Sequence, residues 1–153
     1  MTQLRLLQPG DLEGIARFFE GLSDESLYHR FFSRGQGGPL YELAYLRALD
    51  SQQAAALVAE EAGRIIGLAR YHRTGAGHAE VAVVVADERQ HHGVGRGLLR
   101  ALTAVARRNG IETLDVSMLG DNLAALGLLR RLAGPRPLQL DHGVFEATIP
   151  LAG

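Results

Sequence analysis

Three glycines at alternate positions, Gly93, Gly95 and Gly97, lie between a valine-rich segment and a stretch with helical periodicity. Glycine lets a backbone approach a ligand closely, and the first N–H groups of a helix point outward with the positive end of the helix dipole behind them. Each exposed contact of this kind contributes about 0.3 to 1 kcal/mol, so several are needed to hold a pyrophosphate. The segment is therefore predicted to bind a phosphate-bearing ligand.

Two common phosphate-binding motifs fit this turn poorly. The dinucleotide pattern G-x-G-x-x-G fails because Leu98 occupies the position of its third glycine, although Asp115, about twenty residues on, is placed to be a ribose partner. The nucleotide-binding P-loop needs a lysine, and the chain contains none. The dinucleotide interpretation is weakened, and the P-loop interpretation is excluded.

The same turn resembles the central motif of the GNAT superfamily of N-acyltransferases, Q/R-x-x-G-x-G/A, which lies between a strand and a helix. Gln90, Gly93 and Gly95 match this motif in full, and the expected order of strands and helices follows the plan of that family along nearly the whole chain. The resemblance implies acetyl-CoA, or a related acyl-CoA, as co-substrate, with its pyrophosphate bound by backbone amides of the turn. The implied cofactor-binding residues are Gln90, His91, His92, Gly93, Val94, Gly95, Arg96 and Gly97.

Glu80 interrupts the apolar run 79–85, where a buried charge is costly unless it has a purpose or a partner. An amine must be neutral to attack an acyl group, yet a lysine-type amine with a pKa of about 10.4 is almost fully protonated at neutral pH. The resemblance implies that Glu80 is the general base, commonly acting through water. An ordinary cross-strand ion pair of Glu80 with Arg70 or Arg73 is the alternative.

The resemblance implies further contacts to the acyl-CoA. In that family the strand before the turn is bulged and splays from the next strand, which frees backbone groups for the pantetheine arm and the thioester carbonyl. Val83, Val84 and Val85 are the implied positions. Asn122 begins a segment similar to the family's N-x-x-A and is either another cofactor contact or a helix N-cap.

Leu129 occupies the position at which many relatives carry a tyrosine that protonates the leaving thiolate. A thiol with a pKa of about 8.5 is a tolerable leaving group unaided, so activity does not require that acid. The hydroxyls that could substitute, although each is more often a packing residue, belong to Tyr28, Tyr41, Tyr45 and Tyr71. The missing tyrosine also keeps a non-catalytic acyl-CoA sensor among the alternatives.

Two other features of the turn have simpler interpretations. His91 and His92 are adjacent on a turn and so point apart, and the sequence places no third ligand near them, so no metal site is expected. Arg96 either reaches a phosphate or lies on the exposed face of the helix.

The hydrophobic periodicity predicts the elements that position these residues. Strands are expected at 3–7, 54–60, 64–72, 79–85, 113–118, 137–140 and 144–149, and helices at 12–20, from 23 to the segment 36–39 that ends it, 40–49, 96–108 and 121–132. The predicted fold is α/β (α+β), with a mixed, mostly antiparallel central sheet flanked by helices, as in the GNAT family. One such domain is expected to occupy residues 1–153.

Composition limits the other options. The formal net charge of -1 gives no general attraction to nucleic acid or to an anionic membrane, and no segment is apolar enough for a membrane span or a signal peptide. The absence of cysteine excludes disulfides, thiolate metal sites and cysteine nucleophiles. A cytoplasmic protein is expected, and a homodimer is compatible with the sequence.

The acceptor is assigned from resemblance alone. The segments 22–32 and 143–151 resemble those of bacterial protein-lysine acetyltransferases of the same superfamily. A protein lysine is therefore the favoured amine acceptor, and a small-molecule amine is the runner-up. A structural or interaction domain that binds no CoA is the remaining alternative.

Overall fold

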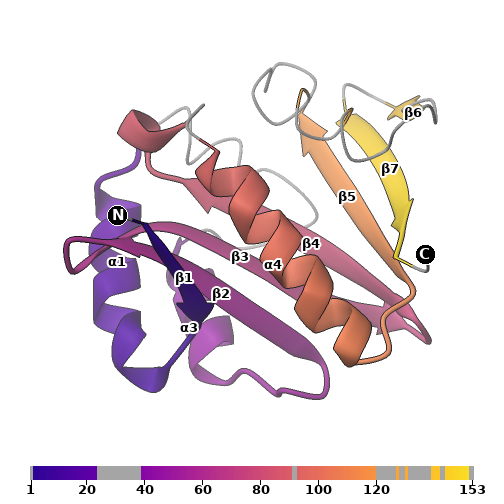
Figure 1. Cartoon of the computed structure of the whole chain (residues 1–153), viewed down its shortest axis with the longest axis horizontal. Coiled ribbons are helices and arrows are strands. Elements are labelled where there is room, and N and C mark those ends of the chain that lie inside the picture. The colour runs from indigo at the N-terminus through magenta and orange to yellow at the C-terminus, as the bar shows by residue number, and fades with distance from the viewer. Residues whose placement is uncertain are drawn as a thin grey trace.

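The computed structural model describes residues 2–23, 39–90, 93–119, 127, 130, 139–141 and 144–151. Its strands and helices follow one another along the chain as shown in Figure 1. They are β1 (Gln3–Leu6), α1 (Leu12–Glu20), α3 (Pro39–Arg47), β2 (Ala54–Glu61), β3 (Arg64–Gly75), β4 (His78–Val85), α4 (Val94–Arg108), β5 (Thr113–Leu119), β6 (Gln139–Asp141) and β7 (Val144–Pro150). Short 3-10 helices, η1 (Pro9–Asp11) and η2 (Asp87–Arg89), precede α1 and the glycine turn.

In the described part of the chain the strands form one mixed sheet in the order β1-β2-β3-β4-β5-β7-β6. Neighbouring strands of this sheet are antiparallel except β4 and β5, which run parallel. Parallel strands need a crossover connection, and α4 supplies it by running back along the sheet (Figure 1). The α/β class with a mostly antiparallel sheet, predicted from the sequence, is confirmed.

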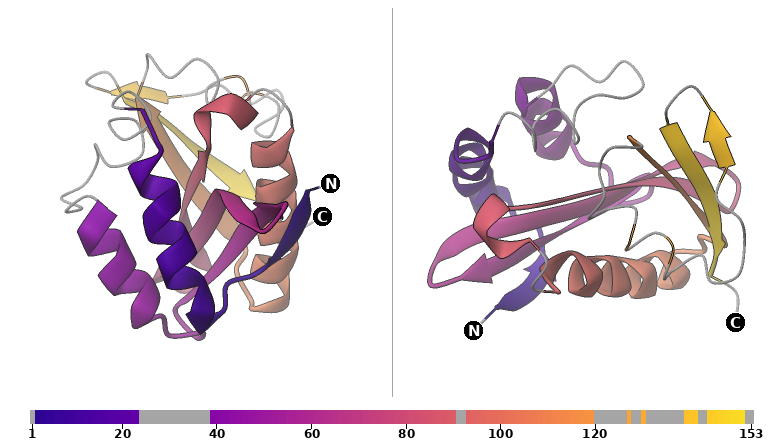
Figure 2. Two further views of the ribbon diagram at one scale, coloured as in Figure 1. Left: turned by 90° about the vertical axis from the view of Figure 1, so that its left-hand side faces the viewer. Right: turned by 90° about the horizontal axis from the view of Figure 1, so that it is seen from above.

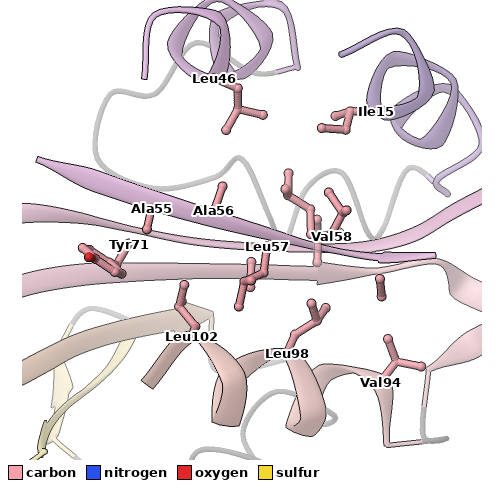
Figure 3. Packing of buried hydrophobic residues seen from close by; sticks show 14 of the residues in the cluster. Ile15, Leu46, Ala55, Ala56, Leu57, Val58, Tyr71, Val94, Leu98 and Leu102 are labelled. Atoms are coloured by element: carbon pink, nitrogen blue, oxygen red, sulfur yellow. The ribbon is translucent and has the colours of Figure 1, made fainter. Parts of the chain in front are cut away.

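Helices cover both faces of the sheet: α4 lies against one face, and α1 and α3 lie against the other (Figure 2). Because side chains alternate along a strand, sequence neighbours on β2 belong to different halves of the core. Val58 lies on the side of Ile15 in α1, and Leu57 lies on the side of Leu98 in α4 (Figure 3). The sheet therefore has two buried faces over its central strands.

Gly67 on β3 lets α4 approach the sheet closely. A Cβ atom at this position would lie 2.9 Å from Cδ1 of Leu98 and 3.3 Å from Cγ1 of Val94. Both of these α4 side chains are buried. The same contact fixes the start of the helix, and with it the glycine turn, against the sheet.

The predicted boundaries agree closely with the structure, with two informative differences. α4 begins at Val94, two residues before the predicted start, because Val94 packs on the sheet instead of belonging to an open turn. β3 continues to Gly75, three residues past its predicted end, and has Thr74 as an extra residue in its pairing with β4. The helix predicted from residue 23 lies almost wholly outside the described residues. Of the one at 121–132 only residues 127 and 130 are described, both helical.

Candidate active site

The glycine turn ends at Gly93, immediately before the first residue of the 15-residue helix α4. Gly93 has a left-handed backbone with φ +86°, and no heavy atom lies within 4 Å of where its Cβ would be. Glycine alone takes up this conformation at no steric cost. Gly97 donates the first helical hydrogen bond to the carbonyl oxygen of Gly93, at 3.0 Å. The N–H groups between them therefore point past the end of the helix, as an anion site requires.

The residues of this turn divide by burial. Gly93 and Arg96 are exposed, and Gly95 and Gly97 are half-buried. Val94 is buried against Gly67, so its side chain anchors the turn and only its backbone faces outward. Exposed glycine backbone on an anchored helix end is an arrangement that a phosphate group can approach.

The Gln90 side chain ties the turn to β4, because its Nε2 atom donates a hydrogen bond to the carbonyl oxygen of Val85 at 3.1 Å. Nearby, the Asp87 carboxylate accepts a hydrogen bond at 3.2 Å from the backbone N–H of Ser23, three residues after the end of α1. These contacts hold the connection between β4 and α4 in place. The motif glutamine therefore contacts the protein's own strand as well as belonging to the predicted binding turn.

The backbone of β4 presents alternate residues to its two neighbours. Ala86 donates a backbone hydrogen bond to Ile66 at 2.8 Å, and such bonded pairs recur at every second residue of an antiparallel pair. Val84 is therefore bonded to β3. The N–H and C=O groups of Val83 and Val85 point the other way, towards β5. Of the three valines predicted to offer backbone groups to a ligand, the outer two have the required orientation.

The pairing between β4 and β5 ends at Glu80, which lies opposite Asp115. Beyond this pair the two strands diverge (Figure 1), so the backbone groups of Val83 and Val85 border an opening between them. We call this region the β4–β5 splay, formed by residues 81–85 of β4 and residues 116–119 of β5. The predicted splay of the valine strand is thus observed.

The predicted bulge of the valine strand is not found in its pairing with β3. β4 pairs with β3 residue by residue from Ala79 to Val85, and the extra residue in this pair, Thr74, belongs to β3. The divergence of β5, rather than an irregularity of β4, is what exposes the backbone of the valine strand.

Glu80 lies at the vertex of the β4–β5 splay. Its side chain is 30% exposed and shares a sheet face with His72, its partner in the β3 register, and with Asp115, its partner in the β5 register. The distance from Glu80 Oε2 to His72 Nε2 is 3.6 Å. Five residues of strand, or about 17 Å, separate Glu80 from the turn end of β4.

The two arginines proposed as ion-pair partners of Glu80 have their principal contacts elsewhere. Arg70 is bound to Glu42 of α3, through Nε to Oε2 and through Nη2 to Oε1 at 2.8 Å. Arg73 donates to the backbone carbonyls of Gln52, at 2.9 Å, and Asn109. The residue directly across from Glu80 is His72, which the sequence-based interpretation did not consider.

His72 lies beside the buried Glu42–Arg70 pair, whose side chains are 1% and 3% exposed. Nη1 of Arg70 is 3.1 Å from Nδ1 of His72. The guanidinium group lies over the Tyr45 ring, which meets the imidazole edge-on. Burial lowers the pKa of His72, and the Arg70 charge lowers it further, against the smaller opposing effects of Glu80 and Glu42. The imidazole is therefore neutral at pH 7.

The described tyrosines differ in their relation to Glu80. Tyr71 is buried on the α4 face of the sheet, and its hydroxyl accepts a hydrogen bond from Asn109 Nδ2 at 2.7 Å. Glu80 lies on the opposite face, so Tyr71 is a packing residue and not a general acid for this site. Tyr45 lies on the Glu80 face.

Several predicted site residues lie outside the described part of the structure, namely His91, His92, Asn122 and Leu129, together with Tyr28 and the side chain of Tyr41. Asp115 is described, and it lies at the far end of β4 from the glycine turn, beside Glu80. The suggestion that Asp115 binds a ribose next to the turn is therefore wrong. Among the described residues, no three His, Cys, Asp or Glu side chains gather as a metal ion would need.

Sequence reasoning missed the Glu42–Arg70–His72 cluster. Arg70 and His72 are two residues apart on a strand and so share a face, which was a usable signal. Their partner Glu42 comes from a separate helix, and its placement over β3 depends on tertiary packing. Only the structure brings the three side chains together next to Glu80.

A helix start with outward N–H groups, a pair of strands that splay apart and a carboxylate at the vertex of the splay form an arrangement that can hold a long phosphate-bearing ligand. Residues 22–134 match the acetyltransferase (GNAT) family. The chain belongs to the acetyltransferase (GNAT) family, a class of acetyl-CoA-dependent N-acyltransferases.

The relatives agree with this assignment. The chain is 36% identical over 154 residues to acetyltransferase Pat of Mycolicibacterium smegmatis, covering 96% of this chain and 45% of that protein. It is 34% identical over 116 residues to an acetyltransferase of Pseudomonas aeruginosa, covering 72% of this chain and 62% of that protein. The chain thus spans about half the length of these relatives.

Solved structures show the same fold. The GNAT domain of S. lividans PAT superimposes with a TM-score of 0.85 at 28% identity, covering 97% of this chain and 90% of that one. A cAMP-binding acyltransferase from Mycobacterium smegmatis gives a TM-score of 0.67 at 27% identity, covering 99% of this chain and 44% of that one.

Among the helices that the structure describes, none combines the length and the apolar character needed to cross a lipid bilayer.

Proposed function

We propose that the protein transfers the acetyl group of acetyl-CoA to a primary amine, with a protein lysine as the favoured acceptor. The observation that carries this proposal is the position of Glu80 at the vertex of the β4–β5 splay. The candidate base therefore lies at one end of the exposed edge of β4, and the glycine turn follows the other end. A donor laid along this edge spans about 17 Å between its phosphate end and the carboxylate.

The residues present fit acetyl-CoA. The outward N–H groups at the start of α4, around Gly95, suit the pyrophosphate. The outward N–H and C=O groups of Val83 and the N–H group of Val85 suit the amide-rich pantetheine arm, whereas the Val85 carbonyl oxygen already accepts from Gln90. The thioester would then lie near Glu80, where the strands separate.

Glu80 would act as the general base. It removes a proton from the acceptor's ammonium group, directly or through water, because only the neutral amine has a lone pair for attack. The amine nitrogen then bonds to the thioester carbonyl carbon and becomes cationic. It loses its second proton to solvent as the C–S bond breaks and CoA leaves as its thiolate. Solvent supplies the proton to the thiolate, whose conjugate acid has a pKa of about 8.5 in the cysteine analogue.

Two observations support the choice of an amine and of a protein acceptor. Glu80 and Asp115 place two carboxylates side by side on one sheet face, which suits a positively charged acceptor. The similarity to acetyltransferase Pat extends along 96% of the chain. The single domain over residues 1–153, the cytoplasmic location and the homodimer stay predictions.

The acceptor is tested by comparing two substrates with the same reacting group, a peptide with one lysine and lysine blocked at its α-amine and carboxyl groups. We expect acetyl-CoA to release free CoA with both, and kcat/KM to be higher for the peptide because only the peptide has additional contacts. The chain contains no lysine, so any acetyl-lysine belongs to the acceptor. Equal or higher kcat/KM for the blocked amine would favour a small-molecule acceptor. Stabilisation by acetyl-CoA without any CoA release across a broad amine panel would favour a non-catalytic sensor.

Replacing Gly95 by alanine is expected to weaken the binding of acetyl-CoA without lowering the stability of the fold. Gly95 has helical backbone angles in the first turn of α4, so alanine should not lower the thermal midpoint. The added methyl group obstructs the approach of a phosphate, and we expect the Kd for acetyl-CoA to rise at least ~10-fold, about 1.4 kcal/mol.

The measurement is the shift in thermal midpoint across an acetyl-CoA titration, in which ligand at 100 times Kd stabilises by about 2.7 kcal/mol. Gly10→Ala in η1 is the matched control, because nothing lies within 4 Å of its Cβ position and it is remote from the turn. An unchanged titration for Gly95→Ala would place the pyrophosphate elsewhere.

A further inference from the structure

The side chains of Glu42, Arg70, His72 and Glu80 form a continuous row from the core to the candidate base. The row begins at the buried carboxylate of Glu42 in α3, passes through Arg70 and His72 on β3 and ends at Glu80 on β4. Each contact in the row restricts the orientation of the next side chain.

Glu42 fixes the orientation of Arg70. The guanidinium group donates to both carboxylate oxygens, from Nε and from Nη2, and the Tyr45 ring lies 4.4 Å from its Cζ atom. Such two-point contacts are geometrically specific, because the planar fork of arginine matches a carboxylate. The remaining nitrogen, Nη1, is thereby aimed at His72.

Arg70 in turn fixes the tautomer of His72. Arginine has only donors, so the 3.1 Å contact between Nη1 and Nδ1 requires Nδ1 to accept. A neutral imidazole with an accepting Nδ1 carries its proton on Nε2. Nε2 is the nitrogen that faces Glu80 Oε2 at 3.6 Å.

The surroundings of His72 keep it neutral. In the described part of the chain, the charged or titratable groups that face it are Arg70 on its own strand, Glu80 on β4, and Glu42 and Tyr45 on α3, while its β2 neighbour is Ala54. Burial and the Arg70 charge lower the pKa of His72. A neutral donor beside Glu80 orients the carboxylate without the full charge of an imidazolium, which would make the carboxylate a weaker base.

We propose that His72 is a positioning residue for Glu80: held by Arg70 with its proton on Nε2, it donates to Oε2 of Glu80 and so fixes the orientation of the carboxylate. This inference rests on the proposed function. The 3.6 Å distance is longer than a hydrogen bond, and contacts of catalytic acids and bases commonly tighten when substrates bind.

Two substitutions at His72 distinguish the role of Nδ1, which accepts from Arg70, from the role of Nε2, which donates to Glu80. In His72→Asn, the amide lies at the position of Nδ1 along the side chain, so it can accept from Arg70 but cannot reach Glu80. In His72→Gln, the amide lies at the position of Nε2, so it can still donate to Glu80. We expect kcat of His72→Asn to fall about tenfold, the rate equivalent of one hydrogen bond to a charged group. We expect His72→Gln to stay within about threefold of the wild type, because that hydrogen bond is kept.

A double substitution shows whether His72 acts through Glu80. If it does, adding His72→Asn to Glu80→Gln should cost no further rate, because the base is already absent. A merely structural role would give the same loss in both backgrounds.

Several results would overturn the proposal: equal losses in both His72 variants, an additive loss in the Glu80→Gln background, or a wild-type rate in His72→Asn. Long-range ¹⁵N–¹H NMR of the wild-type imidazole decides the case even where a variant does not fold, since a proton on Nδ1 contradicts the proposal. A wild-type rate in Glu80→Gln alone would instead reject the proposed base, and so identifies a failure of the proposed function itself.

Discussion

Glu80→Gln is expected to lower kcat about 10²- to 10³-fold at pH 7, the usual contribution of a positioned general base. Glutamine keeps the size of the side chain and its hydrogen-bonding oxygen but cannot take up a proton. The turn and the outward backbone groups of β4 do not involve the Glu80 side chain. The stabilisation of the protein by acetyl-CoA should therefore be unchanged.

The pH dependence gives this expectation a second readout. An acceptor amine with a pKa of about 10.4 loses its proton to solvent as the pH rises, so the variant should recover much of its rate near that pH. Initial rates of CoA release from pH 6 to 10 measure this. A deficit that stays constant over the whole range would contradict a role in deprotonating the acceptor.

Asp115→Asn is the matched control for Glu80→Gln. Asp115 is the in-register neighbour of Glu80, on the same sheet face, and it accepts a hydrogen bond from Thr148 Oγ1 at 2.9 Å, which asparagine can also accept. The control removes the same charge from the same region without removing the vertex carboxylate. We expect kcat to change less than about threefold, since exposed charges act mainly through weak, screened attraction. Equal losses in the two variants would indicate attraction of the acceptor rather than proton transfer.

Local patterns predicted most of the fold. Residues 12–20 were predicted as a helix and form α1, because the pattern of apolar residues records which face is buried. The start of α4 was misplaced by two residues, since the burial of Val94 depends on Gly67, which is distant in sequence. The extension of β3 to Gly75 depends likewise on its pairing with β4.

The candidate site was predictable where its signal is local. Glu80 was identified because it is a charge within a valine-rich run, and the turn because its glycines precede a helix. The roles of Arg70 and His72 were not predicted, because they depend on the position of Glu42 over β3. The sequence also does not show towards which neighbouring strand the N–H and C=O groups of a residue point. Val84 was therefore grouped with Val83 and Val85, although its backbone is bonded to β3.

Arg70→Met is expected to lower the free energy of unfolding by about 3 to 5 kcal/mol, because it leaves the Glu42 carboxylate buried without its partner. The side chains of Glu42 and Arg70 are 1% and 3% exposed, so water cannot replace the lost contacts. Urea unfolding at pH 7 measures the loss. Arg17→Met is the matched control, since Arg17 pairs with Glu13 at 3.6 Å while both are largely exposed, at 69% and 85%. Its cost should not exceed about 0.5 kcal/mol.

Removing both charges should restore most of that stability. In Arg70→Met with Glu42→Leu no buried carboxylate is left unpaired, and replacing a buried ion pair by apolar side chains is often neutral or better. Wild-type stability in the single variant, or no recovery in the double variant, would show that the pair does not act through burial of the Glu42 charge. The double variant should nevertheless remain slow, because nothing then holds the tautomer of His72 beside Glu80. Recovery of stability without recovery of rate would show that this buried pair serves to orient His72 in the site and is not needed to stabilise the fold.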